Sequence, residues 1–268
     1  MVPRPDAMPL TGRERELAAV TAAVRSSAVA GVLLAGAAGV GKTRLAQEAA
    51  DSAQADGQRV LTIRPPAGSR QLPLASLISL LPSGAGPSAP TDAGSHPVQT
   101  GLGLVERGLH GLISSGPTLL MVDDAHLLDE VSATVIHQLV VERSVRLLAT
   151  LRVDRAAYPA GPVATGPVAA LWKDRYVLRF DVAPLSDAET DALVGAVLQG
   201  QVEGRTLRQI RQATGGNPLF LRELLISARE TGVLDDNGGV WRAYGKLGVT
   251  GRADLRQALD LHPGEHQS

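Results

Sequence analysis

Residues 31–43 read Gly31-Val32-Leu33-Leu34-Ala35-Gly36-Ala37-Ala38-Gly39-Val40-Gly41-Lys42-Thr43. The stretch joins a short apolar run to a glycine-rich turn, and a helix-forming segment follows at about 42–55. Its second part fits G-x-x-x-x-G-K-[ST], in which glycines let successive backbone N–H groups turn toward a phosphate. The alternative is a chance glycine-rich turn, against which the length of the motif and its place between strand and helix argue. We therefore expect a buried strand, a phosphate-binding loop and a helix whose N-terminus faces the phosphate.

The motif assigns a separate task to each of its polar side chains. Lys42 is expected to reach the β- and γ-phosphates, and the hydroxyl of Thr43 to ligate Mg²⁺. The sequence thus predicts ATP or ADP with Mg²⁺ as the bound cofactor. The predicted nucleotide-binding residues of the loop are Gly36, Ala37, Ala38, Gly39, Val40, Gly41, Lys42 and Thr43.

A pair of carboxylates follows a second apolar run, about 80 residues after the loop. Asp123 and Asp124 end the expected strand 118–122, as a Walker B motif requires. Asp123 is expected to hold Mg²⁺ through water, and Asp124 to orient or deprotonate the attacking water. Asp124 could instead be only a polar strand end. For Asp129 we favour the N-cap of the next helix.

Two further polar residues lie close to these motifs in the sequence. Arg152 follows strand 145–151, where it would either sense the γ-phosphate or be an exposed strand-terminal arginine; spacing does not separate the two. The six histidines have no metal-ligand spacing. We expect a surface role for His126, although it follows the acidic pair closely.

Strands and helices alternate over residues 1–183, which predicts an α/β domain with a parallel sheet and helices on both faces, a three-layer P-loop NTPase sandwich. The expected strands are 31–35, 59–63, 118–122, 145–151 and about 176–181. The expected helices are 12–28, 42–55, 74–81, 98–114 and 129–143. Thr11 and Glu14 predict a capping box at the first helix. We expect a flexible surface loop over 82–97 and irregular structure over 153–175.

The pattern changes at Pro184, where a small helical lid subdomain is expected over 184–232. Its helices are predicted to run to about 199, over 203–213 and over 218–231, and Ser186 with Glu189 predicts a second capping box. Residues 233–247 predict a β-hairpin. We expect the remaining part, 233–268, to hold this hairpin and a tail, an incomplete start of a winged helix.

Composition narrows the class of partner. The chain has 268 residues, a net charge of −1 and no cysteine. The missing basic excess argues against direct DNA binding by this chain, and the missing cysteines exclude disulfides. No apolar run approaches the ~20 residues that cross a bilayer, and Met1–Pro5 does not resemble a signal peptide. We therefore expect no membrane partner and a cytoplasmic location.

Several stretches resemble one family in the same order along the chain. They are Leu10–Leu17 with its Gly-Arg-Glu segment, Val122–Asp129, Leu148–Arg152 and Thr214–Leu224 with Gly-Asn-Pro. Together they resemble the STAND-type, AAA-like ATPase module of the large ATP-binding LuxR-type transcriptional regulators, relatives of MalT. The likeness spans about 10–247. Members usually continue through a winged helix and helical repeats into a DNA-binding helix-turn-helix, whereas this sequence ends at Ser268.

The resemblance implies roles for four residues. Gly12 and Arg13 would lie along the adenine and ribose, Arg152 would be the sensor arginine, and Pro218 would pack on the base. The residues themselves offer a local explanation as well. Asn217 as N-cap and Pro218 at the first helical position account for Gly-Asn-Pro without a ligand.

The leading hypothesis is a nucleotide-controlled switch in a LuxR-type regulator, with slow ATP hydrolysis and with self-association or protein partners as its output. Asp124, Lys42 and Arg152 are then the predicted catalytic residues. The alternatives are a module that holds nucleotide without hydrolysis, a P-loop kinase or other phosphotransferase, and a replication-initiator-type ATPase.

Overall fold

The computed structural model describes residues 10–66, 68–78, 80, 97–113, 116–153, 176–236 and 239–243. The chain forms two compact units. One comprises residues 16–38 and 42–182, and the other comprises 1–15, 39–41 and 183–268. The predicted loop at 82–97 (but for residue 97), the predicted irregular stretch at 153–175 (but for residue 153) and the predicted tail lie outside the described residues.

The first unit is built on a five-stranded parallel sheet with the order β2-β3-β4-β1-β5. The strands are β1 (Gly31–Gly36), β2 (Arg59–Ile63), β3 (Thr118–Val122), β4 (Arg146–Arg152) and β5 (Val177–Asp181). All five match the predicted strands to within about a residue at each end. The expectation of a parallel α/β fold of the P-loop type is confirmed.

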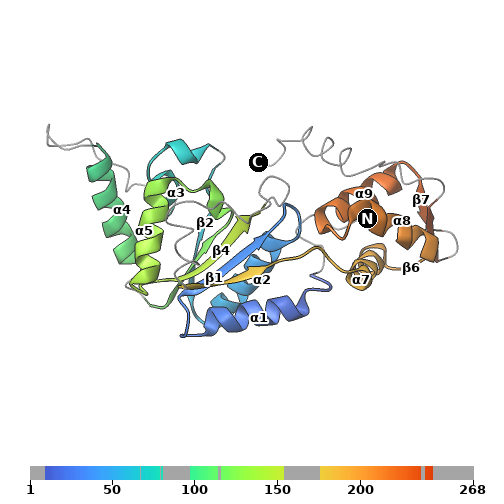
Figure 1. Cartoon of the computed structure of the whole chain (residues 1–268), viewed down its shortest axis with the longest axis horizontal. Helices are drawn as coiled ribbons and strands as arrows, with labels where there is room; N and C mark the ends of the chain where they lie inside the picture. Colours follow the sequence, from blue (N-terminus) through green and yellow to red (C-terminus); the bar gives the residue numbers. More distant parts are fainter. Residues whose placement is uncertain are drawn as a thin grey trace. The chain divides into compact units, whose positions relative to one another are not determined.

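Helices cover both faces of this sheet, with α1 and α2 on one side and α3, α4 and α5 on the other (Figure 1). They are α1 (Glu14–Arg25), α2 (Lys42–Ala55), α3 (Ala75–Ile78), α4 (Pro97–Ile113) and α5 (Glu130–Val141). Two short 3₁₀ turns, η2 (Ser69–Gln71) and η3 (Ala125–Leu127), complete the unit. Because the sheet lies between two helical layers, its central strands are mostly apolar.

The first helix starts later than predicted. It begins at Glu14 rather than at residue 12, and Glu14 Oε1 accepts the N–H of Gly12 at 3.1 Å. The predicted capping box required Glu14 at the third helical position, bonded back to Thr11. That capping-box prediction is therefore wrong in its register.

The core of the first unit explains why β1 and β3 are almost entirely apolar, with Thr118 at the start of β3 as their one polar side chain. Every residue of β3 is buried, as are the first five of β1. Leu33 and Val122 pack with Ile136 of α5 on one face. The carboxyl ends of β1, β3 and β4 meet at the same edge of the sheet, which is where the polar residues of the site are found.

The second unit combines three helices with a small sheet. Its elements are α7 (Asp187–Leu198), β6 (Gln201–Val202), α8 (Gly204–Thr214), α9 (Pro218–Glu230), β7 (Leu234–Asp236) and β8 (Val240–Ala243). The capping box of Ser186 and Glu189 is present, and Asn217 caps α9 with Pro218 in its first turn. Both capping predictions are confirmed.

The sheet of this unit is larger than the predicted hairpin. Strands β7 and β8 pair antiparallel, and β6 adds a third strand parallel to β8. Trp241 on β8 donates from Nε1 to the carbonyl of Leu198 at 3.1 Å, and the Arg229 guanidinium lies 5.4 Å from its ring centroid. A two-residue strand such as β6 has no periodicity of its own, so the sequence pattern does not indicate it.

Candidate nucleotide-binding site

The loop between β1 and α2 has the backbone that the motif predicts. Gly39 and Gly41 have φ values of +76° and +99°, in the left-handed region that side chains rarely adopt. Helix α2 begins at Lys42, so its first N–H groups point back toward the loop. The loop thus presents backbone donors and a helix N-terminus together, the arrangement that binds phosphate.

Lys42 is buried, with 6% of its surface exposed. Its Nζ donates to the carbonyl oxygen of Ala37 at 2.8 Å, so the ammonium is held within the loop. Burial lowers the pKa of Lys42 below its ordinary value; the nearby Asp124 and Asp123 oppose this effect, and Arg152 adds to it. The lysine is therefore in a low-dielectric position, where contact with a phosphate is strong.

The structure brings together the two residues predicted to hold Mg²⁺. Thr43 Oγ1 donates to Asp123 Oδ1 at 2.9 Å across 80 residues of chain. A hydroxyl and a carboxylate are hard oxygen donors, and Mg²⁺ in nucleotide sites is held by one or two such groups with phosphate oxygens and water. Among the described residues there is no group of three or more His, Cys, Asp or Glu side chains that could hold a metal ion. The donor set fits Mg²⁺ bound together with a nucleotide rather than a site that the protein fills alone.

Thr150 is a site residue that the sequence reasoning did not assign. It lies on β4, is fully buried, and donates from Oγ1 to Asp123 Oδ1 at 2.7 Å. Thr150 Oγ1 also accepts the backbone N–H of Asp124 at 2.7 Å. One hydroxyl therefore fixes both acidic residues. Its signal in the sequence was a polar residue inside an otherwise apolar strand, two positions before Arg152.

Asp124 lies just beyond β3 in the left-handed region, with φ 54° and ψ 51°, and it is the N-cap of η3. A non-glycine residue in this conformation stores strain, and such residues cluster at functional sites. Its side chain is 47% exposed and therefore accessible to a water molecule. This geometry suits a carboxylate that orients a nucleophile.

His126 does not have the surface role that we expected. Its side chain is only 29% exposed, and Nδ1 lies 3.7 Å from Asp124 Oδ1. Burial lowers the pKa of His126, Asp124 opposes the shift, and the positive charges of Arg152, Lys42 and Arg70 add to it. The imidazole is therefore part of the charged cluster around Asp124.

Arg152 is at the end of β4, directly opposite Gly36 in the register of β1 and β4. Its side chain is exposed, and its charge lowers the pKa of both Lys42 and His126. The structure thus places Arg152 beside the phosphate loop. Whether it senses the γ-phosphate remains a prediction.

Asp129 has the capping role that we favoured. It is 2% exposed, and Oδ1 accepts the backbone N–H groups of Ser132 at 2.8 Å and Leu74 at 3.0 Å. It therefore joins the start of α5 to the turn before α3, and it does not reach the nucleotide site.

In the other unit, Arg13 packs among backbone carbonyls. It is 6% exposed and donates to the carbonyl oxygens of Val40, at 3.4 Å, and Ala183. Gly12 has φ +83°, and a Cβ there would lie 2.8 Å from Glu189 Cβ. The predicted contacts of Gly12 and Arg13 with adenine and ribose stay predictions.

The N-terminus of α9 lies against the middle of the phosphate loop within this same unit. Leu219 donates its N–H to the carbonyl of Gly39 at 3.3 Å, and a Cβ on Gly39 would lie 2.6 Å from Asn217 Oδ1. Gly39 therefore has a reason to be glycine besides its backbone angle. Pro218 is at the first position of α9, and its contact with the base stays a prediction.

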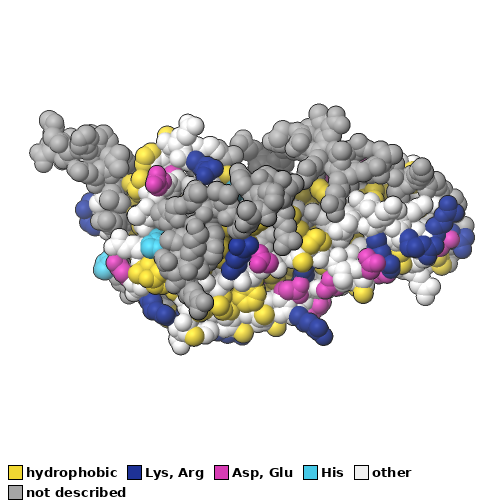
Figure 2. Space-filling model, in the orientation of Figure 1, with side chains coloured by type: hydrophobic (Ala, Val, Ile, Leu, Met, Phe, Trp, Pro, Cys, Tyr) yellow, Lys and Arg dark blue, Asp and Glu magenta, His cyan; other side chains and the backbone are white. Residues whose placement is uncertain are grey.

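Charges of both signs are mixed on the face of the molecule seen in Figure 2, where Lys and Arg side chains alternate with Asp and Glu. On α8, which carries three arginines, Arg205 and Arg208 are exposed. Arg211 on the same helix pairs with Asp191 at 2.7 Å through Nε and also contacts Asp187. In the described part of the chain, no helix is long and apolar enough to cross a membrane.

Comparison with known proteins agrees with this geometry. A family model described as the AAA ATPase domain matches residues 9–151, just over half of the chain. No curated protein matches.

Solved structures share the fold at low sequence identity. Cdc6p from Pyrobaculum aerophilum has a TM-score of 0.56 and 15% identity over 85% of this chain and 65% of its own. Domain III of the Thermotoga maritima replication initiation protein DnaA has a TM-score of 0.53 and 15% identity over 88% and 90%. The Thermotoga maritima RuvB Holliday junction branch migration motor has a TM-score of 0.52 and 15% identity over 82% and 62%. This chain spans about 60% of the length of the first RuvB structures that it matches.

Proposed function

Because the chain belongs to the AAA ATPase domain family, we propose that it binds Mg²⁺-ATP, hydrolyses it slowly, and uses the nucleotide state as a switch. Gly36–Thr43 would hold the phosphates, with Lys42 on the β- and γ-phosphates. Thr43 and Asp123 would hold Mg²⁺, which supplies charge neutralisation at the phosphates. Asp124 would orient the attacking water, and Arg152 would contact the γ-phosphate.

The observation that carries this proposal is the joint hydrogen bonding of Asp123 by Thr43 and Thr150. Oδ1 of Asp123 accepts from both hydroxyls, at 2.9 Å and 2.7 Å, although the three residues come from separate elements. A carboxylate held in this way needs no reorganisation when a metal–phosphate group arrives. A buried loop lysine and an exposed acid beside it complete the set that phosphoryl-group hydrolysis requires.

We place this switch in a transcriptional regulator of the LuxR type. The support for this narrower assignment is the ordered set of sequence motifs, from Gly12-Arg13 through Asp123-Asp124 and Arg152 to Pro218. The output would be self-association or the binding of a protein partner. The chain's net charge of −1 argues against direct DNA contact by this part.

The proposal is tested by calorimetry of ATP and ADP binding with Mg²⁺, followed by phosphate release on the same sample. We expect binding of both nucleotides and turnover well below one per second. Lys42→Ala should abolish binding. Asp124→Asn should retain binding and lose turnover, whereas the control Asp51→Asn, an exposed carboxylate on α2 that bonds to Gln47, should change neither.

A different experimental outcome would contradict each part of the proposal. Micromolar ATP affinity in Lys42→Ala would refute the assigned phosphate loop. Binding without phosphate release would favour a module that holds nucleotide statically. Rapid transfer to an added acceptor, with little release in its absence, would favour a kinase.

A further inference from the structure

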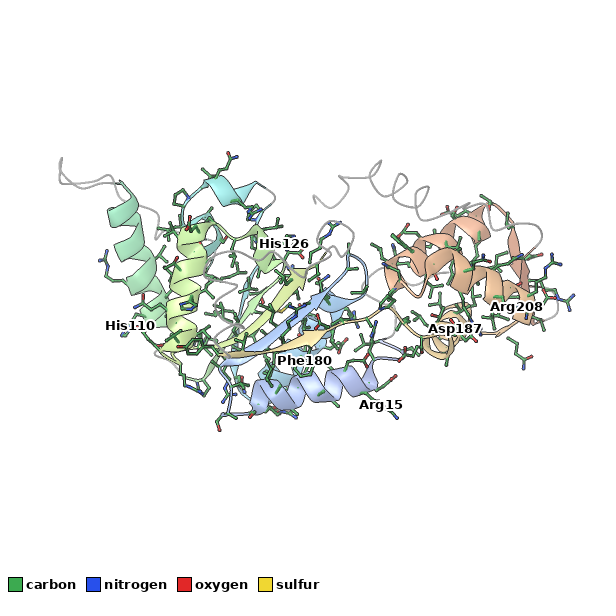
Figure 3. The ribbon with its side chains drawn as sticks, in the orientation of Figure 1. Arg15, His110, His126, Phe180, Asp187 and Arg208 are labelled. Carbon is green, nitrogen blue, oxygen red and sulfur yellow. The ribbon has the colours of Figure 1, made fainter. Side chains whose placement is uncertain are left out.

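An imidazole nitrogen faces the proposed water-orienting carboxylate. His126 Nδ1 lies 3.7 Å from Asp124 Oδ1, and this nitrogen is shielded from solvent and has no hydrogen-bond partner among the described residues. Figure 3 shows His126 at the edge of the sheet toward which β1 and β4 point, whereas His110 lies near the opposite end. His126 therefore belongs to the edge that carries the phosphate loop.

We propose that His126 is a positioning residue for ATP hydrolysis, which holds the Asp124 carboxylate in place by donating a hydrogen bond from Nδ1. The proposal rests on the hydrolytic function proposed above. It assigns no proton transfer to His126. The imidazole acts only through Asp124.

Asp124 has a fixed backbone and a free carboxylate, which is why it needs such a partner. Its N–H is held by Thr150 Oγ1 at 2.7 Å, and its carbonyl accepts the N–H of Leu127 at 2.8 Å. Its carboxylate makes no hydrogen bond to any described residue and is 47% exposed. A carboxylate that samples several rotamers orients water poorly, so a donor beside it would improve the alignment of the nucleophile.

The distance of 3.7 Å is too long for a hydrogen bond, but a rotation that moves the carboxylate by about 1 Å would close it. Catalytic hydrogen bonds are often long in free enzymes and tighten in the complex with substrate. The buried Nδ1 has no hydrogen-bond partner among the described residues, and an unpaired buried nitrogen is unfavourable. A hydrogen bond from Nδ1 to the Asp124 carboxylate would therefore satisfy the buried nitrogen and fix the orientation of the carboxylate.

Burial and the surrounding positive charges favour the neutral imidazole. Burial and the nearby Arg152, Lys42 and Arg70 lower the pKa of His126, with only Asp124 opposing them. A neutral imidazole donates from one nitrogen only. It can therefore hold the carboxylate without cancelling the negative charge that orients a water molecule.

The first test compares three substitutions of His126 in the full chain. Asparagine places an amide N–H near the position of Nδ1, glutamine places it near Nε2, and alanine removes the donor. We expect ATP affinity within about threefold of wild type in all three, and turnover reduced about tenfold in His126→Ala, which corresponds to about 1.4 kcal/mol. His126→Asn should recover most of this loss and His126→Gln should not.

The matched control is His110→Asn, an exposed histidine on α4, which should leave binding and turnover unchanged. Wild-type turnover in His126→Ala would overturn the proposal. Equal recovery by asparagine and glutamine would also overturn it, because packing rather than a donor at Nδ1 would then be restored. If the alanine variant fails to fold, the contrast between asparagine and glutamine still decides.

A second test needs no hydrolysis. Nitrogen-15 NMR of the imidazole in nucleotide-free protein reports which ring nitrogen carries the proton. We expect the Nδ1–H form in the wild type and a shift toward Nε2–H in Asp124→Ala. An Nε2–H imidazole that does not respond to Asp124→Ala would overturn the proposal. A wild type that binds ATP, releases no phosphate and shows the Nδ1–H form would refute the proposed hydrolysis and retain the pairing of His126 with Asp124.

Discussion

Thr150 Oγ1 lies 2.7 Å from Asp123 Oδ1 and donates a hydrogen bond to it. Because Oγ1 also accepts the N–H of Asp124, the two acids are held by a single side chain on the neighbouring strand. β3 and β4 are adjacent and parallel, so their carboxyl ends reach this edge together. The position of both acids therefore depends on β4 as well as on β3.

Thr150→Val should separate hydrolysis from binding. Valine keeps the volume of threonine but leaves the Asp124 N–H unpaired, which should cost about 1–2 kcal/mol of unfolding free energy. Turnover should fall at least tenfold because both acids lose their alignment, and ATP affinity should change by less than about threefold. Phosphate release and urea unfolding measure these effects. Thr150→Ser keeps the hydroxyl and should stay close to wild type; equal losses in both variants would contradict this role.

Gly39→Ala should be more damaging than Gly41→Ala. Both glycines have positive φ, so alanine introduces strain of about 1–2 kcal/mol at either position. Only at Gly39 would the new Cβ also meet atoms, with Asn217 Oδ1 at 2.6 Å and Leu219 Cβ at 2.9 Å. Denaturant unfolding compares the two variants directly. Equal destabilisation would show that the side chain of Asn217 moves aside without cost.

Pro218→Ala distinguishes a base contact from a helix start. If the proline packs on adenine, ATP affinity should fall several-fold while stability changes little. Asn217→Ala is the companion variant, because it removes the side-chain cap that accepts from Leu219 and Phe220 and should cost about 1 kcal/mol of unfolding free energy. Calorimetry and urea unfolding separate the two effects. Unchanged affinity in Pro218→Ala would leave the helix start as its only role.

Glu189 should make the stability of α7 depend on pH. Its carboxylate accepts from the Ser186 backbone N–H and hydroxyl, each at 2.7 Å, and these bonds lower its pKa below the ordinary 4.5. Since the folded pKa is the lower one, the stabilisation is present above about pH 4.5 and is lost as the pH falls through the folded value. Glu189→Gln does not titrate. The stability advantage of wild type over Glu189→Gln, from urea unfolding, should therefore shrink at acidic pH; a constant difference would contradict the ionic cap.

Local patterns predicted most of the fold. The strands around the site are short apolar runs between helices, and a chain of this kind has few alternatives to a parallel sheet with buried central strands. The caps at Ser186, Asn217 and Asp129 were also predictable, because a cap depends on residues within three positions of one another. The proximity of Thr43 to Asp123 was predictable because the two motifs place both residues at one edge of the sheet; their roles toward Mg²⁺ stay predictions.

The remaining features depend on contacts between distant segments. Thr150 is tied to Asp123 across 27 residues, and His126 was assigned to the surface because sequence gives no measure of its burial. Strand β6 exists only because β8 lies beside it. The start of α1 was misplaced because Glu14 bonds to Gly12 rather than to Thr11, a choice that the Thr-x-x-Glu pattern does not reveal.

The bond from Lys42 to Ala37 bears on how the loop discriminates among anions. The Lys42 ammonium already donates to the carbonyl oxygen of Ala37 at 2.8 Å. Binding a phosphate would therefore replace this carbonyl oxygen by a phosphate oxygen. A lone inorganic anion offers little beyond that exchange and should compete weakly. A nucleoside triphosphate would add contacts along its whole length, so we expect the loop to favour the complete nucleotide over its fragments.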